Sequence, residues 1–112
     1  MPTNKLIDTT NLEATLAEFA RQRDWDPFHT PRSLLLALTG EVGELVEIFQ
    51  WMTDAQADAV MQTDKAEHVK QEVADVLLYL MRIAMVLKID IDEAVRSKIA
   101  LNAVKYPPTR LA

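Results

Sequence analysis

The sequence predicts an all-α fold, and three observations lead to that prediction. Only two of the 112 residues are glycine, which is too few for the turns of a strand-based architecture. Helix start signals stand at Thr30-Pro31 and at Asp90, because Thr and Asp cap helix N-termini and Pro suits the first helical position. Long apolar segments with helical periodicity lie between and after these signals.

The length fits one domain, since 112 residues can form a single core and are too few for two ordinary domains. We therefore expect one domain over 1–112, with a helical core from about 11 to 105 and an extended tail over 106–112. The predicted helices cover 11–23, 31–52, 64–88 and 91–105, with a short helix or ordered connection over 53–63.

The third predicted helix is apolar on nearly every side from Val73 to Leu87. A helix of that kind is surrounded by protein, and a chain with so few helices can hardly surround it alone. We therefore expect the long helices to pair with those of a second subunit, so that dimerisation completes a four-helix core.

Two pairs of acids interrupt the apolar segments. Glu41 and Glu44 form one pair and Glu72 and Asp75 the other; residues three apart project from one face of a helix. An exposed like-charge pair costs only about 0.2–0.5 kcal/mol, whereas buried unpaired carboxylates cost far more. Four hard oxygen donors would suit Mg²⁺ or Mn²⁺, although such pairs also occur on solvated helix faces. Gly43 would let a ligand or a neighbouring helix approach the first pair.

Two further groups of residues allow either a structural or a binding interpretation. Trp25, Phe28 and His29 lie in a loop around Pro27, where they either fold back onto the core or form the wall of a pocket that stacks a flat ligand. A polar row lies on one face of the last predicted helix, and it is either solvated surface or a phosphate-binding set. Its members are Lys98, Asn102 and Lys105.

Composition excludes several classes of function. The net charge is −5 and no basic run is present, so nucleic acid would be repelled over most of the surface. The chain has no cysteine, which rules out disulfides and thiolate chemistry and suits a reducing cytoplasm. Asp75 and Arg82 interrupt the most apolar stretch, so a membrane span is not expected.

The order of these motifs resembles the MazG-like all-α nucleotide pyrophosphohydrolases, especially the dCTP pyrophosphatase branch. The resemblance covers about Phe19 to Pro107. A lone Glu-x-x-Glu motif would be weak evidence for this family. Here a Glu-x-x-Asp motif follows it at the spacing that the family shows. The segments that carry the resemblance are 19–25, 28–38, 40–45, 49–51, 72–80, and the row Lys98, Asn102 and Lys105.

This resemblance implies Mg²⁺-dependent hydrolysis of a (d)NTP, dCTP or a related deoxynucleotide, to the monophosphate and pyrophosphate, as house-cleaning of the nucleotide pool. It also implies a homodimer, or a homotetramer built from two dimers. Leu16 stands where the dCTP-specific relatives carry a histidine. The implied metal and catalytic residues are Glu41, Glu44, Glu72 and Asp75. The implied substrate-binding residues are Trp25, Phe28, His29, Trp51, Tyr79, Lys98, Asn102 and Lys105.

Other functions stay open on the sequence alone. The same chemistry could act on a damaged nucleotide or on phosphoribosyl-ATP. A different class of protein would be a non-catalytic helical oligomer that senses nucleotides or binds a protein partner. The general base would be a carboxylate that is not fully committed to metal, with Glu44 and Glu47 as candidates.

Overall fold

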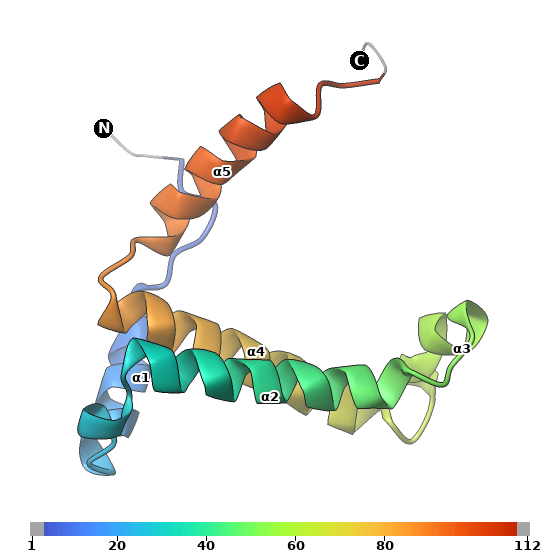
Figure 1. Cartoon of the computed structure of the whole chain (residues 1–112), viewed down its shortest axis with the longest axis horizontal. Coiled ribbons are helices and arrows are strands. Elements are labelled where there is room, and N and C mark those ends of the chain that lie inside the picture. The colour runs from blue at the N-terminus through green and yellow to red at the C-terminus, as the bar shows by residue number, and fades with distance from the viewer. Residues whose placement is uncertain (1–3, 110–112) are drawn as a thin grey trace.

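The computed structural model describes residues 4–109, and all regular structure within that range is helical. Figure 1 shows α2 and α4 lying side by side, α1 at one end of this pair and α5 projecting away from it. In chain order the elements are α1 (Thr10–Gln22), η1 (Asp26–Phe28), α2 (Pro31–Phe49), α3 (Asp54–Asp58), η2 (Val60–Gln62), α4 (Ala66–Val86) and α5 (Ile91–Lys105). The prediction of an all-α fold is confirmed.

Local sequence signals set the helix starts. Thr30 caps α2 by accepting a hydrogen bond from the Ser33 N–H, with Pro31 at the first helical position. Thr53 and Gln56 form a reciprocal capping box at α3, and Asp90 caps α5 through the Glu93 N–H. The predicted helices over 31–52 and 64–88 are each shorter by a few residues, since α2 ends at Phe49 and α4 spans Ala66–Val86.

The core of the chain is small and lies around the α2–α4 pair. Leu34 is fully buried on α2 and Met81 and Ala84 are buried on α4. Ala20 of α1 and Val60 of η2 are also buried. This pairing brings the acid-bearing segments of α2 and α4 together.

The last helix is held only near its beginning. Asp92 is buried, and its Oδ1 accepts hydrogen bonds from the backbone N–H groups of Leu6 and Ile7 at 2.7 and 3.1 Å. Its Oδ2 accepts a third from Arg96 at 2.8 Å. These contacts hold the pKa of Asp92 below its usual value, first through the Ile7 N–H. From there the helix extends away from the α2–α4 pair (Figure 1), and Val104 is 83% exposed.

The chain is much less compact than a typical domain of its length. Its radius of gyration is 17.5 Å, against about 13 Å for a compact domain of this size. Large apolar side chains are exposed on both long helices, among them Leu35, Val46, Val73 and Leu80. None of the helices within residues 4–109 has the length and hydropathy to cross a bilayer. The predicted extended tail over 106–112 continues past the described part of the chain, so residues 110–112 lie outside it.

Candidate functional site

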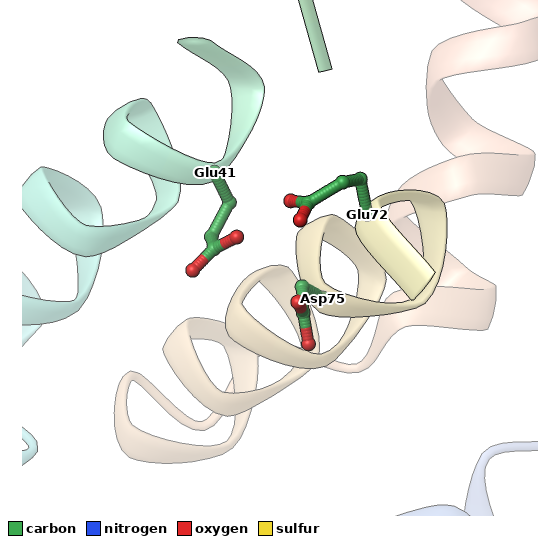
Figure 2. A group of neighbouring side chains, drawn as sticks. All are labelled: Glu41, Glu72 and Asp75. Atoms are coloured by element: carbon green, nitrogen blue, oxygen red, sulfur yellow. The ribbon is translucent and has the colours of Figure 1, made fainter. Parts of the chain in front are cut away.

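Three of the four predicted acids meet between the two long helices. Glu41 projects from α2 toward Glu72 and Asp75 of α4, as Figure 2 shows. One carboxylate oxygen from each residue lies within 4.8 Å of the others. Glu72 is only 7% exposed, so the cluster is partly withdrawn from water.

The cluster is short of hydrogen-bond donors. Glu41 Oε2 and Glu72 Oε2 are buried and have no hydrogen-bond partner among the described residues. A hydrogen bond to Glu72, burial, and the charges of Glu44 and Asp75 together raise the pKa of Glu41 to about 7. Near neutral pH the metal-free cluster therefore retains a proton that an ordinary pair of carboxylates would release.

These features fit a divalent cation. Buried carboxylate oxygens without donors are costly unless a positive charge compensates them. The cluster supplies only oxygen ligands, which suit a hard cation such as Mg²⁺ or Mn²⁺. The Nε2 atom of His68 lies 3.4 Å from Glu72 Oε1, but the side chain of His68 is 60% exposed. The acid cluster could therefore bind a metal.

A cavity opens directly beside the acid cluster. Its volume is about 300 Å³, and Asp75 forms part of its wall. Aromatic rings line the same cavity: the centroids of Phe19 and Trp25 are 5.5 Å apart, and those of Trp25 and His29 are 5.6 Å apart. We call this space the aromatic pocket. Its lining residues are Leu16, Phe19, Ala20, Trp25, His29, Asp75, Leu78, Tyr79 and Arg82.

A basic residue of α4, Arg82, lines the same pocket as Asp75. Arg82 donates a hydrogen bond from Nε to His29 Nδ1 at 2.9 Å and another from its guanidinium to Asp26 Oδ1. Its side chain is 12% exposed, whereas that of Asp26 is 57% exposed. Burial and the charge of Arg82 lower the pKa of His29, which favours the neutral ring.

The structure separates the other predicted site residues into groups. Trp25, His29 and Tyr79 line the aromatic pocket. Phe28 is 72% exposed outside the lining of that pocket, and Trp51 is 89% exposed near the end of α2. Glu44 is exposed and lines a different cavity, together with Glu47, Lys65 and His68.

The predicted phosphate-binding row lies on α5. Lys98 and Lys105 are exposed and Asn102 is half-buried. The helix that carries them projects away from the α2–α4 pair (Figure 1). Within one chain, these residues are therefore not part of the acid cluster.

Sequence reasoning missed Arg82 as a site residue. Its charge was visible as an interruption of an apolar helix, and served only as an argument against a membrane span. A lone arginine on a helix that is otherwise apolar implies a buried acceptor, and that signal could have placed it in a pocket. Its partners Asp26 and His29 lie more than 50 residues earlier and could not be assigned from local spacing.

Comparison with known proteins gives concordant matches. Residues 37–110 match the MazG-like family. The dCTP pyrophosphatase 1 of Rattus norvegicus is 48% identical over 92 residues, which cover 81% of this chain and 54% of that protein. The dATP/dGTP diphosphohydrolase of Cyanophage S-2L is 31% identical over 99 residues, covering 84% of this chain and 79% of that protein.

A solved structure extends the likeness to the fold. The crystal structure of a pyrophosphatase from Archaeoglobus fulgidus is 37% identical, with a TM-score of 0.83, and covers 96% of this chain and 100% of that one. By contrast, this chain spans only about half the length of the dCTP pyrophosphatases it matches.

Proposed function

This chain belongs to the MazG-like family, and from that premise we propose that it hydrolyses a nucleoside triphosphate to the monophosphate and pyrophosphate. The similar proteins support this proposal, since one is a dCTP pyrophosphatase and another a dATP/dGTP diphosphohydrolase. The observation that carries it is the contact between the acid cluster and the aromatic pocket, because Asp75 belongs to both. A deoxynucleotide such as dCTP is the preferred candidate, in a house-cleaning role.

The acid cluster would hold Mg²⁺, or Mn²⁺, through Glu41, Glu72 and Asp75, with Glu44 as a fourth carboxylate. When bound, the metal would supply positive charge to the triphosphate and polarise water for attack at phosphorus. The protein would contribute the fixed position of three carboxylates on two packed helices. The exposed carboxylates of Glu44 and Glu47 are the candidates for accepting the proton of the attacking water.

The aromatic pocket would hold the nucleoside. Flat rings at its wall suit stacking with a base, and Trp25, His29 and Tyr79 are placed there. Leu16 adds an apolar side chain to the wall of this pocket. Phe28 and Trp51 stay predicted substrate contacts, which would require a neighbouring chain or a movement of the surface that carries them.

Phosphate binding would require a second copy of the chain. We propose that Lys98, Asn102 and Lys105 act at the site of another subunit, because α5 projects away from the acid cluster of its own chain. The exposed apolar residues of α2 and α4, and a radius of gyration of 17.5 Å, support a homodimer or a dimer of dimers. Location in the cytoplasm stays a prediction from the absence of cysteine.

Product analysis tests the proposed reaction. The purified protein is incubated with each dNTP and NTP, with and without Mg²⁺, and monophosphate, diphosphate, phosphate and pyrophosphate are resolved. We expect monophosphate and pyrophosphate only with metal. A diphosphate product, or no turnover of any canonical or modified nucleotide, would contradict the proposal. The second result would favour a helical oligomer that senses nucleotides without hydrolysing them.

A further inference from the structure

A contact among three residues connects the wall of the aromatic pocket to the C-terminal part of α4. Arg82 has a side chain that is only 12% exposed, and its guanidinium contacts both Asp26 of η1 and the ring of His29. Asp26 and His29 belong to the loop that precedes α2, whereas Arg82 lies more than 50 residues later. This contact therefore sets the position of a pocket side chain from a different element.

The contact also selects one form of the His29 ring. An arginine guanidinium has only donors and stays protonated in proteins. Since Arg82 Nε lies 2.9 Å from His29 Nδ1, that nitrogen has to be the acceptor and cannot carry a proton. A neutral imidazole with an unprotonated Nδ1 carries its proton on Nε2. The imidazolium form would instead place two N–H groups against each other.

Burial and the neighbouring guanidinium favour the same neutral form. Both lower the pKa of His29, with burial as the larger cause, and Asp26 opposes them only in part. With Nδ1 engaged by Arg82, Nε2–H is the ring group left for a ligand. Around it the pocket offers aromatic faces, with the centroid of Trp25 5.6 Å from that of His29.

We propose that Arg82 is a positioning residue that holds His29 as the Nε2–H tautomer, so that the aromatic pocket reads a hydrogen-bond acceptor on the edge of the bound base. This inference rests on the proposed function of the pocket as the nucleoside site. It adds to that function because it assigns the donor and the acceptor of one hydrogen bond. The protein donates the hydrogen bond, and a ring nitrogen or carbonyl oxygen of the base accepts it. A base that turns a donor toward His29 would leave two N–H groups opposed, which is unfavourable.

Nitrogen NMR on the full-length protein tests the tautomer without any substrate. In protein with ¹⁵N-labelled histidine, we expect His29 to show an unprotonated Nδ1 and a protonated Nε2 at pH 7. Arg82→Met removes the donor but keeps an apolar side chain, and should allow the Nδ1–H form to appear. Arg21→Met is the matched control, because Arg21 is an exposed arginine that pairs with Glu18 on α1. A protonated Nδ1 in the wild-type protein would overturn the role of Arg82, even if the nucleotide were hydrolysed.

Ligand binding tests the acceptor. The probe is dCTP with an imido group between the α and β phosphorus atoms, which resists hydrolysis there, in the presence of Mg²⁺. We expect it to shift the His29 Nε2–H resonance in the direction of a stronger hydrogen bond, and Arg82→Met to weaken its binding about 3- to 10-fold, the value of one hydrogen bond. In hydrolysis assays the same variant should raise KM by a similar factor while leaving kcat within about twofold.

Two substitutions of His29 separate the hydrogen bond from packing. The amide of His29→Gln can accept from Arg82 and donate to the base, whereas His29→Leu retains bulk but neither group. We expect the Gln variant to recover most of the affinity that the Leu variant loses. Equal losses in both, with the fold intact by circular dichroism, would overturn the proposed hydrogen bond. Failure of the wild-type protein to bind or hydrolyse any nucleotide would overturn both this inference and the proposed function.

Discussion

The acid cluster and helix α5 carry residues that the family resemblance assigns to one site, but the structure places the two groups apart. Glu41, Glu72 and Asp75 come from two helices that pack along each other, and their carboxylates lie within 4.8 Å. The residues Lys98 and Lys105 lie on an exposed helix that extends away from that pair (Figure 1). One chain therefore brings the proposed metal ligands together and leaves the proposed phosphate-binding residues elsewhere.

This difference shows which part of the proposed site a monomer can form. Pairing of α2 with α4 is enough to gather three carboxylates at a cost in desolvation, which a metal would offset. A polyanionic substrate also needs cations, and the described part of the chain places no lysine row beside the cluster. We infer that assembly and activity are coupled, and the predictions below would break or sharpen that inference.

The largest effect is expected from the acid cluster. Glu72→Gln keeps the shape of the side chain but removes a buried carboxylate of the proposed metal site, so it should lower kcat/KM at least about 100-fold. In metal-free protein it should raise the Tm, because it removes a buried carboxylate oxygen that has no partner. Addition of Mg²⁺ should then no longer stabilise the variant. Steady-state kinetics and thermal melts with and without chelator measure these effects.

The control for this variant lies on the same helix. Glu67 is exposed on α4 and contacts Gln71 and Lys70, so Glu67→Gln should retain activity and the stabilisation by Mg²⁺. Full metal-dependent turnover in Glu72→Gln would remove the acid cluster from the mechanism.

A smaller loss is expected from the α5 lysines. Lys98→Ala and Lys105→Ala should each raise KM for the triphosphate about 10-fold, since each removes a charged hydrogen-bond donor. Neither should change the affinity for metal alone, because α5 is remote from the cluster in its own chain. Steady-state kinetics measure KM for the triphosphate, and metal titrations measure the affinity for metal. Lys70→Ala, at an exposed position of α4, is the control. An equal rise in KM in this variant would mean that the α5 variants act only through the general loss of positive charge.

The pH dependence of stability tests the electrostatics of the cluster. The pKa of Glu41 is raised from 4.5 to about 7 in the folded chain, so between these values the folded state holds a proton that the unfolded state releases. Glu41 therefore contributes most stability below about 4.5 and loses it as the pH rises through about 7. Metal-free protein should show this decline in thermal melts, and Glu41→Gln should flatten it. The same decline in Glu41→Gln would assign it to another group.

The smallest effect concerns Gly43. A methyl group added there meets nothing within 4 Å in the single chain, so Gly43→Ala should stabilise the isolated helix by up to about 1 kcal/mol. If a neighbouring helix packs against this face, the methyl should instead weaken the assembly. We expect the variant to dissociate at higher protein concentration than the wild type in light-scattering measurements. A simple gain in stability with unchanged assembly would argue that the Gly43 face is free.

Local signals in the sequence predicted much of the fold and indicated part of the candidate site. Thr30 with Pro31 and Asp90 mark helix starts by their own side-chain chemistry, and this information lies within one helical turn. The acid pairs were recognisable because Glu72 and Asp75 sit in an apolar helix, where a charge requires a partner.

What the sequence could not predict depends on contacts between distant residues. At the start of α5, Asp92 accepts hydrogen bonds from the backbone of Leu6 and Ile7, more than 80 residues earlier. The contact of Arg82 with His29 is likewise a tertiary one. Residue spacing does not specify such contacts, and it does not say whether a lysine row acts in its own chain or in a second copy.

Subunit mixing tests the central claim, that α5 of one copy completes the acid cluster of another. Glu72→Gln is combined with the double variant Lys98→Ala/Lys105→Ala, and mixed oligomers are verified by native mass spectrometry. If α5 acts on a second copy, a mixed dimer contains one site with intact acids and intact lysines, so activity should recover to about half of the wild-type value per dimer. If α5 acts within its own chain, every site keeps one defect, and verified mixed oligomers without recovered activity would contradict the account.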